Sequence, residues 1–325
     1  MMNQGTHIPT LTTYPGMAYV PIPPSEAALP SVEAQPWLRV FDSPSDLEGL
    51  HFNRDGSELY FVHCRDNLVC KVDMKTKDIS VVLELNRYIP DYAVSAVKVH
   101  RDGRLFVACV NADFTDGGIL FINPDGSGVT RVAEHLVADD MAFDRRGGIY
   151  ATDMRGRPTN ETGAIFYISS DFSERYTVFK NIAAPNGITL STDERVLWIT
   201  DILNGNIIRT ELTEDGLRPG RIGQCVVYRT TGYVGPDSLM VDNDDNVYCA
   251  MYGQGRVLVF NSWGWPIGQV LMPRRDEGYH LATTHPMIRP GTRELYICTN
   301  DGRYGAGIFR AGSFAVANTK AFYLQ

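Results

Sequence analysis

A sixfold internal repeat is the feature that most constrains the fold of this chain. Each copy contains a short alternating apolar run, a turn, and a stronger strand that carries an aromatic residue. The copies begin at Glu48, Ser95, Asp139, Asn186, Asp237 and Thr284. The aromatic residues of the second strands are Tyr60, Phe106, Tyr150, Trp198, Tyr248 and Tyr296, at separations of 46, 44, 48, 50 and 48 residues. A repeat of this length is typical of a propeller blade or a solenoid unit.

The residue pattern inside each copy predicts a β-hairpin. In the first copy, Leu50 and Phe52 alternate with polar residues, Asp55-Gly56 favours a turn, and the run ELYFV is rich in β-formers. Two further short strands fill each repeat, which gives four strands per copy. The sequence therefore predicts an all-β fold, a six-bladed β-propeller with four-stranded blades around a central metal-binding channel. An irregular β-sandwich with accidental spacing is the alternative, whereas the absence of capped helical patterns argues against a parallel α/β fold.

The two ends of the repeat array predict how the ring closes. Because a propeller must leave no exposed sheet edge, we expect Trp37–Phe41 to supply an outer strand to the last blade. Residues 1–35 are rich in proline, and we expect them to form an extended arm that packs on the outside or is partly disordered. Residues 36–325 are predicted to form a single propeller domain.

Composition and charge exclude several kinds of partner. The formal net charge is −8 and no basic run is present, so nucleic acid is not expected as a partner. No apolar run reaches the roughly 18 residues of a membrane span, and the N-terminus lacks the pattern of a secretory signal. The six cysteines are interpreted as reduced and mostly buried. We therefore expect a cytoplasmic monomer or dimer without membrane partners.

The first position of each repeat predicts a metal site. All six of these residues carry a side-chain oxygen, and equivalent positions in a propeller should point at the axis from the same depth. Three of them, Glu48, Asp139 and Asp237, are carboxylates that would repel one another in the absence of a cation. Calcium accepts several oxygen ligands in loose geometry, so the sequence predicts one calcium ion held by Glu48, Asp139, Asn186 and Asp237.

Other interpretations of the six repeat-start positions, called the ring positions below, remain open. Magnesium requires tighter octahedral geometry and is the second choice, and zinc is disfavoured because the ring contains no His or Cys. The structural alternative is that these residues form turns, because Asp, Asn and Ser often begin strands by bonding to nearby backbone. Glu48 is a poor turn residue, which favours the metal.

Polar residues beyond the ring predict a small-molecule cup. His63, Asp153 and Asp201 come three residues after the aromatic positions, Tyr252 lies in an adjoining loop, and His285 follows Thr284. We expect these five residues to line the substrate pocket, although a histidine at a strand end is more often a surface residue.

Several stretches resemble the regucalcin and gluconolactonase family, also called the senescence-marker-protein family. They include LEGLHF, ADDMAFD, PNGITLSTDERVLWIT and GPDSLMVDNDDNVYCAMYGQGRVLVFN. The stretches PIGQVLMP, RDEG and THP resemble most the bacterial drug-responsive lactonases of that family. The resemblance implies a calcium-dependent hydrolase of small lactones. It places metal ligands on Glu48, Asp139, Asn186 and Asp237, a further metal contact on Ser238, and the proton donor on Asp237.

The resemblance leaves the mechanism and a second metal to be decided. Either Asp237 or Asp139 is expected to act as general base toward water, or Asp237 donates a proton to the leaving alkoxide. Close relatives have a second, structural calcium near the segment ADFTDGG, where Thr115, Asp116 and Gly117 remain as candidate ligands. The neighbouring segment AEHLVADD is shorter here, so we expect this chain to lack that second calcium.

Two alternative functions keep the predicted fold. One is a calcium-dependent hydrolase of other small esters or phosphotriesters, since an open cup favours promiscuity. The other is a calcium-stabilised propeller that binds a partner without catalysis. Hydrolysis that a chelator abolishes while the protein stays folded would distinguish an enzyme from a binding module.

Overall fold

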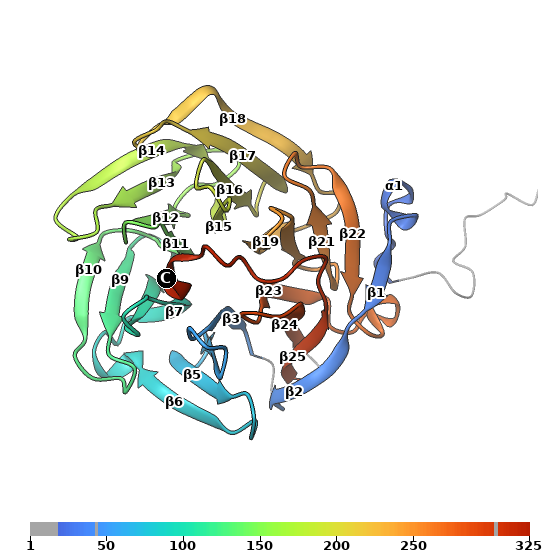
Figure 1. Ribbon diagram of the computed structural model, residues 1–325, viewed down its shortest axis with the longest axis horizontal. Helices are drawn as coiled ribbons and strands as arrows, with labels where there is room; N and C mark the ends of the chain where they lie inside the picture. The colour runs from blue at the N-terminus through green and yellow to red at the C-terminus, as the bar shows by residue number, and fades with distance from the viewer. Residues whose placement is uncertain (1–18, 43–44, 302–304) are drawn as a thin grey trace, which may run out of the picture.

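The computed structural model describes residues 19–42, 45–301 and 305–325, and these form a ring of six β-sheets around a central axis (Figure 1). The predicted six-bladed β-propeller is confirmed. In the first three blades the strands run outward from the axis in chain order. They are β3 (Leu47–Phe52), β4 (Glu58–His63), β5 (Leu68–Asp73), β6 (Ile79–Glu84); β7 (Tyr92–Val99), β8 (Leu105–Asn111), β9 (Gly117–Ile122), β10 (Thr130–Glu134); and β11 (Met141–Phe143), β12 (Ile149–Asp153), β13 (Gly163–Ile168), β14 (Arg175–Ile182).

The fourth blade repeats this order, and the last two receive strands from the N-terminal segment. The fourth contains β15 (Pro185–Leu190), β16 (Val196–Asp201), β17 (Asn206–Leu212) and β18 (Pro219–Arg229). The fifth contains β19 (Pro236–Val241), β20 (Val247–Met251), β21 (Arg256–Phe260), β22 (Pro266–Leu271) and, at its outer edge, β1 (Ser31–Glu33). The sixth contains β23 (Ala282–Ile288), β24 (Glu294–Asp301), β25 (Gly305–Gly312) and β2 (Gln35–Phe41).

The N-terminal segment closes the ring as the sequence predicts. Strand β2 pairs antiparallel with β25, so residues from the start of the chain form the outer strand of the last blade. Strand β1 pairs parallel with β22, and the short helix α1 (Pro24–Ala27) lies beside the same blade (Figure 1). Residues 1–18 of the predicted arm lie outside the described residues.

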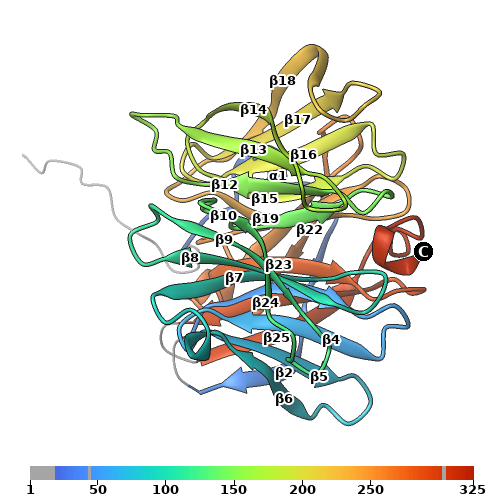
Figure 2. The same ribbon diagram turned by 90° about the vertical axis from the view of Figure 1, so that its left-hand side faces the viewer.

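Helical structure among the described residues is otherwise confined to three single 3-10 turns. They are η1 (Leu85–Arg87), η2 (Arg275–Glu277) and η3 (Phe322–Leu324). The C-terminal segment that contains η3 lies over one end of the channel (Figures 1 and 2). None of the helices in the described part of the chain is long and apolar enough to cross a membrane.

The core lies between the blades, where the repeated aromatic residues pack. All six aromatic positions of the second strands are buried. The inner strands β3, β7, β11, β15, β19 and β23 each contact the next around the axis, and β23 contacts β3. The turn predicted at Asp55-Gly56 is confirmed, since Gly56 has positive φ, and Gly103 and Gly147 have positive φ at the equivalent turns of the next two blades. Local turn chemistry and inter-blade packing therefore specify the same fold.

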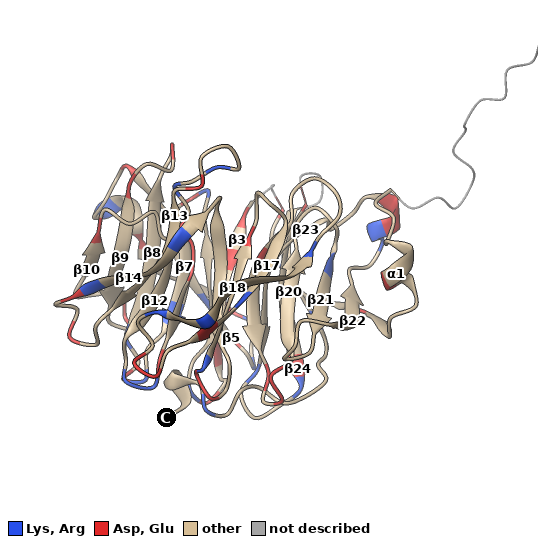
Figure 3. Cartoon of the chain, turned by 90° about the horizontal axis from the view of Figure 1, so that it is seen from above, with Lys and Arg blue, Asp and Glu red and all other residues tan. Residues whose placement is uncertain are grey.

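Charges and cysteines complete the description of the fold. Acidic and basic residues are mixed along both ends of the blades (Figure 3). All six cysteines are unpaired, and Cys70, Cys109, Cys249 and Cys298 are buried as expected. The expectation of burial is wrong for Cys225, because it lies on β18, the exposed outer strand of its blade.

Candidate metal centre

Five of the six repeat-start residues lie at or near the start of an inner strand, whereas Ser95 lies in the middle of β7. The backbone at these positions is irregular. In β3, β7, β15, β19 and β23 the pairing register shifts at or beside the repeat-start residue, as in a β-bulge. In the third blade β11 begins only at Met141, two residues after Asp139. A bulge bends a strand and re-aims the side chains on it. The same irregularity therefore recurs at five of the six repeat-start positions.

Close approach of neighbouring inner strands fixes which residues can follow the ring positions. A Cβ atom on Gly49, after Glu48, would lie 2.6 Å from the backbone nitrogen of Val97 in the next blade. A Cβ atom on Gly187, after Asn186, would lie 2.6 Å from Cα of Ser238. Both distances are too short for a side chain, so these two positions require glycine.

Three ring carboxylates are close enough to perturb one another. Burial raises the pKa of Glu48 well above its ordinary value, and the charges of Asp237 and Asp139 raise it further. Burial and the charge of Asp139 likewise raise the pKa of Asp237. Burial raises the pKa of Asp139 to about 7. The structure thus brings the predicted carboxylates within electrostatic range of one another, and the protein alone favours their protonated forms.

Asn186 and Ser238 add uncharged oxygen atoms that could coordinate a metal beside this cluster. Both residues are buried. Asn186 donates a side-chain hydrogen bond to Asp237, and the backbone N–H of Ser238 also bonds that carboxylate. The Oδ1 atom of Asn186 is buried without a hydrogen-bond partner. A buried acceptor that lacks a donor, beside carboxylates that repel one another, has the chemistry that a hard cation satisfies.

The carboxylates do not form a preassembled cage. Within residues 19–42, 45–301 and 305–325, no three or more His, Cys, Asp or Glu side chains are grouped so that they could hold a metal ion. The residues present nevertheless fit a calcium ion in donor type, since all of the predicted ligands offer oxygen.

The other two ring positions have a structural role. The hydroxyl of Ser95 donates to the carbonyl of Ala138 at 2.8 Å, and the hydroxyl of Thr284 donates to the carbonyl of Leu47 at 2.6 Å. Each bond joins one blade to the next. Their role is therefore to join blades, which differs from the local turn bonds of the structural alternative.

Sequence reasoning missed an ion pair beside the ring. Lys98 Nζ lies 2.8 Å from Asp140 Oδ1, and both side chains are buried. The charge of Lys98 lowers the pKa of Asp139, whereas the charge of Asp140 raises it. The lysine supplies a fixed positive charge near the carboxylates. The signal in the sequence was a lysine inside an otherwise apolar inner strand, SAVKV.

Three predicted pocket residues are engaged in contacts within the protein. Asp153 forms two 2.8 Å hydrogen bonds with Nε of Arg155. Asp201 accepts the backbone N–H of Ala184 at 3.0 Å. His63 is buried and stacks on Phe41, with ring centroids 4.1 Å apart. These contacts support a structural role for the three side chains.

Tyr252 and His285 lie in different parts of the channel. Burial raises the pKa of the Tyr252 phenol, and the charges of Asp46, Asp237 and Glu48 raise it further, so this residue lies near the carboxylates. His285 instead lines a cavity of about 110 Å³ with Lys98, which the C-terminal segment around Phe322 covers. The structure therefore brings Tyr252 to the candidate centre and places His285 in a chamber toward the opposite end of the inner strands.

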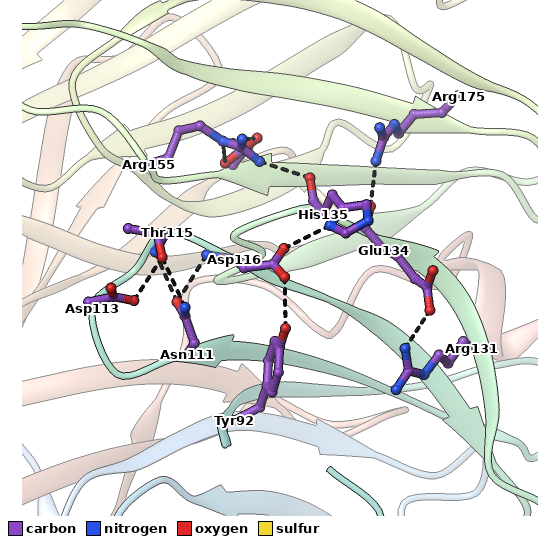
Figure 4. Close-up of polar contacts among 11 residues, drawn as sticks. Tyr92, Asn111, Asp113, Thr115, Asp116, Arg131, Glu134, His135, Arg155 and Arg175 are labelled. Carbon is purple, nitrogen blue, oxygen red and sulfur yellow. Dashed lines mark hydrogen bonds and ion pairs between the residues drawn. The ribbon is translucent and has the colours of Figure 1, made fainter. Parts of the chain in front are cut away.

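Thr115 and Asp116, two candidate ligands of a second calcium, are engaged in contacts within the protein (Figure 4). The Asp116 carboxylate accepts the Tyr92 hydroxyl at 2.8 Å and lies 3.2 Å from His135 Nδ1. The carbonyl of His135 accepts Arg155 at 2.8 Å, and the Thr115 hydroxyl bonds within its own turn. Protein donors thus satisfy the oxygens that a cation would need. The absence of a second calcium remains a prediction.

The fold and the candidate site define the class of this protein, a closed six-bladed β-propeller with carboxylates that interact with one another. Comparison with known proteins identifies the family. Residues 48–301 match the SMP-30/gluconolactonase/LRE-like region. The chain is 43% identical over 325 residues to a protein named lactonase drp35 from Staphylococcus haemolyticus, with 97% of each chain covered. The protein therefore belongs to the SMP-30/gluconolactonase family.

Solved structures share the fold at low sequence identity. A calcium-binding protein, regucalcin, from Agrobacterium tumefaciens aligns with a TM-score of 0.69 and 18% identity over 89% of this chain and 99% of its own. A gluconolactonase from Xanthomonas campestris aligns with a TM-score of 0.66 and 16% identity over 91% and 99%. These similarities establish the propeller fold independently of the sequence match.

Proposed function

We propose that this protein is a calcium-dependent lactonase that hydrolyses the ester bond of small lactones at the mouth of its channel. The observation that carries the proposal is the mutual proximity of Glu48, Asp139 and Asp237, whose charges act on one another. A protein named lactonase, which is 43% identical and aligns with 97% of this chain, supports the reaction class.

Glu48, Asp139, Asn186, Asp237 and Ser238 would hold the calcium ion. When bound, the ion supplies a Lewis acid that polarises the lactone carbonyl. Its charge would also offset the repulsion among the carboxylates and favour their ionised forms.

The protein's own residues then account for proton transfer. Hydrolysis adds water to the lactone carbonyl carbon, breaks the acyl carbon–oxygen bond, and yields a hydroxy acid. Asp237 or Asp139 accepts the proton of the attacking water, and Asp237 is also suited to deliver a proton to the leaving alkoxide oxygen. The hydrogen bonds from Asn186 and the Ser238 backbone hold the Asp237 carboxyl in place for this transfer.

Substitution of Asp237 tests the proposal. Asp237→Asn keeps the shape of the side chain and removes its charge and proton-transfer capacity. We expect hydrolysis of a simple γ- or δ-lactone in calcium to fall by about 10²-fold or more. Full activity in this variant would remove Asp237 from the mechanism.

A chelator experiment tests the metal and the enzyme class together. Addition of EDTA should abolish hydrolysis while far-UV circular dichroism stays unchanged, and calcium should restore it. A substrate panel of lactones, aryl esters and phosphotriesters then identifies the bond that is cleaved. Absence of turnover on the whole panel, with only a lower melting temperature after chelation, would favour a binding module.

The proposal also includes a substrate class and a cellular location. A small lactone or ester is the expected substrate. A cytoplasmic location is supported by six unpaired cysteines, which are typical of a reducing compartment.

A further inference from the structure

A buried polar network connects the N-terminal segment, through the fifth blade, to two loops near the candidate centre. These loops, residues 230–235 and 251–255, are called the mouth loops below. Glu26, in helix α1, forms an ion pair with Arg256 at the start of β21. The side chains are nearly inaccessible, since Glu26 is 3% and Arg256 is 1% exposed. The hydroxyl of Tyr228 also donates to Glu26. A buried guanidinium requires such a partner, because an isolated charge is strongly disfavoured in the interior.

Arg256 is held between two glutamine side chains. Its Nε and Nη2 atoms donate to Oε1 of Gln254 at 3.1 and 2.7 Å. Its Nη1 atom donates to Oε1 of Gln269 at 2.9 Å. Gln269 in turn donates to the carbonyl of Glu26 at 3.2 Å and to the hydroxyl of Ser31 at 3.0 Å. Gln269 therefore connects Arg256 back to the N-terminal segment, on the outer side of the blade.

Gln254 connects Arg256 to the mouth instead. Its Nε2 atom donates to the carbonyl of Thr231 at 3.1 Å. Thr231 belongs to the loop of residues 230–235, which leads directly into β19 and Asp237. The side chain of Gln254 therefore spans the distance between the buried guanidinium and the loop that precedes a ring carboxylate.

Gln254 also belongs to the neighbouring mouth loop. Its backbone N–H donates to the carbonyl of Met251 at 3.0 Å, which closes the turn that carries Tyr252. Tyr252 is the predicted pocket residue that lies near the ring carboxylates. One residue thus joins two mouth loops, through its backbone on one side and its side chain on the other.

We propose that Gln254, oriented by Arg256 and Glu26, is a positioning residue for the substrate mouth. Its amide oxygen must face the guanidinium and its amide nitrogen must face the Thr231 carbonyl, so only one orientation satisfies both ends. This orientation fixes the turn that carries Tyr252 relative to the loop that leads into Asp237. As far as substrate binding is concerned, the inference rests on the lactonase function proposed above.

Two matched substitutions separate positioning from general stability. Gln254→Met and Gln269→Met each remove one glutamine partner of Arg256 with little change in side-chain volume, but only the first removes a bond to a mouth loop. We expect Gln254→Met to raise KM for a lactone about tenfold, the effect of losing its one bond to the loop of residues 230–235, with kcat within about twofold. Gln269→Met should leave KM unchanged even where its melting temperature falls.

Hydrogen exchange provides a readout that does not depend on the reaction. In Gln254→Met, amide exchange should accelerate in residues 230–235 and 251–255 and stay unchanged in the first three blades. In Gln269→Met, the acceleration should appear at residues 26–33 instead. If the exchange pattern holds but no lactone is turned over by the unsubstituted protein, the proposed function fails and the positioning role stands.

A third variant covers the case in which Gln254→Met does not fold. Gln254→Glu keeps an acceptor for Arg256 and loses the donor to Thr231, so it should accelerate exchange in residues 230–235 and raise KM. Parallel changes in KM for the Gln254 and Gln269 variants, or unchanged exchange in both mouth loops, would overturn the proposal.

Discussion

Neutralising Asp139 should stabilise the metal-free protein, because burial and the neighbouring charge of Asp140 disfavour its ionised form. Burial and the charge of Asp140 raise the pKa of Asp139 from 3.8 to about 7. At about 1.4 kcal/mol per pKa unit, this difference corresponds to about 4 kcal/mol when the group is charged. Asp139 is only partly buried, so solvent screening reduces the expected gain for Asp139→Asn to about 2 kcal/mol.

The sign of the pH dependence follows from the raised pKa. Between about pH 4 and pH 7 the folded protein keeps a proton on Asp139 that the unfolded chain has released. The free energy of unfolding of the metal-free protein should therefore fall as pH rises through this window. Asp139→Asn should flatten that fall, and its gain in stability should be smaller at pH 5 than at pH 8.

Urea unfolding in EDTA at pH 5 and pH 8 measures the effect. Asp91→Asn is a suitable control, because Asp91 is exposed. In calcium the order should reverse, since the unsubstituted protein gains stability from the ion and the Asp139→Asn variant gains less. Equal or lower stability of Asp139→Asn in EDTA at pH 8 would show that burial and Asp140 do not penalise the charged form of Asp139.

Three further predictions concern the surroundings of the ring. Thr284→Val should lower the free energy of unfolding by about 1–3 kcal/mol, because it leaves the buried carbonyl of Leu47 without its donor, and denaturant titration measures the loss. Gly187→Ala should cost about 1–3 kcal/mol and weaken calcium binding in calorimetry, because its Cβ would meet the backbone of Ser238. Burial and the charge of Lys98 lower the pKa of His51 to about 3. Between about pH 6.5 and pH 3, His51 is therefore protonated in the unfolded chain and neutral in the folded protein. Stability should fall as pH drops from about 6.5 toward 3, and His51→Gln should reduce this fall in urea midpoints measured across that range.

The fold could be predicted because its information is local and repeated. Each copy carries its own turn and its own buried aromatic residue, so six weak patterns support one another. The strand from residues 37–41 was predictable for a different reason, since an unpaired edge in the last blade needs a partner. Its bounds, Gln35–Phe41, and the added strand β1 could not be inferred from alternation alone.

The candidate site was predictable only where symmetry fixes the geometry. The repeat register selected Asp139 and Asp237, and the charge of Asp139 does act on Asp237. Contacts between different blades have no such regularity. The pairing of Asp153 with Arg155 and the enclosure of His285 under the C-terminal segment depend on side-chain packing that a single sequence does not encode in any local pattern.

The hydroxyl and the carboxylate side chains at the ring positions differ in how they can satisfy their hydrogen-bonding capacity when they are buried. A hydroxyl can satisfy itself by donating to a carbonyl, and both Ser95 and Thr284 do so across a blade boundary. A carboxylate has no proton to donate once it is charged, so it needs a donor or a cation. The two hydroxyl bonds end on the residues just before Asp139 and Glu48, which fixes the backbone that carries each of those carboxylates. The structural and the functional interpretations of the ring are therefore complementary, because the two hydroxyl positions hold the backbone beside two of the proposed metal ligands.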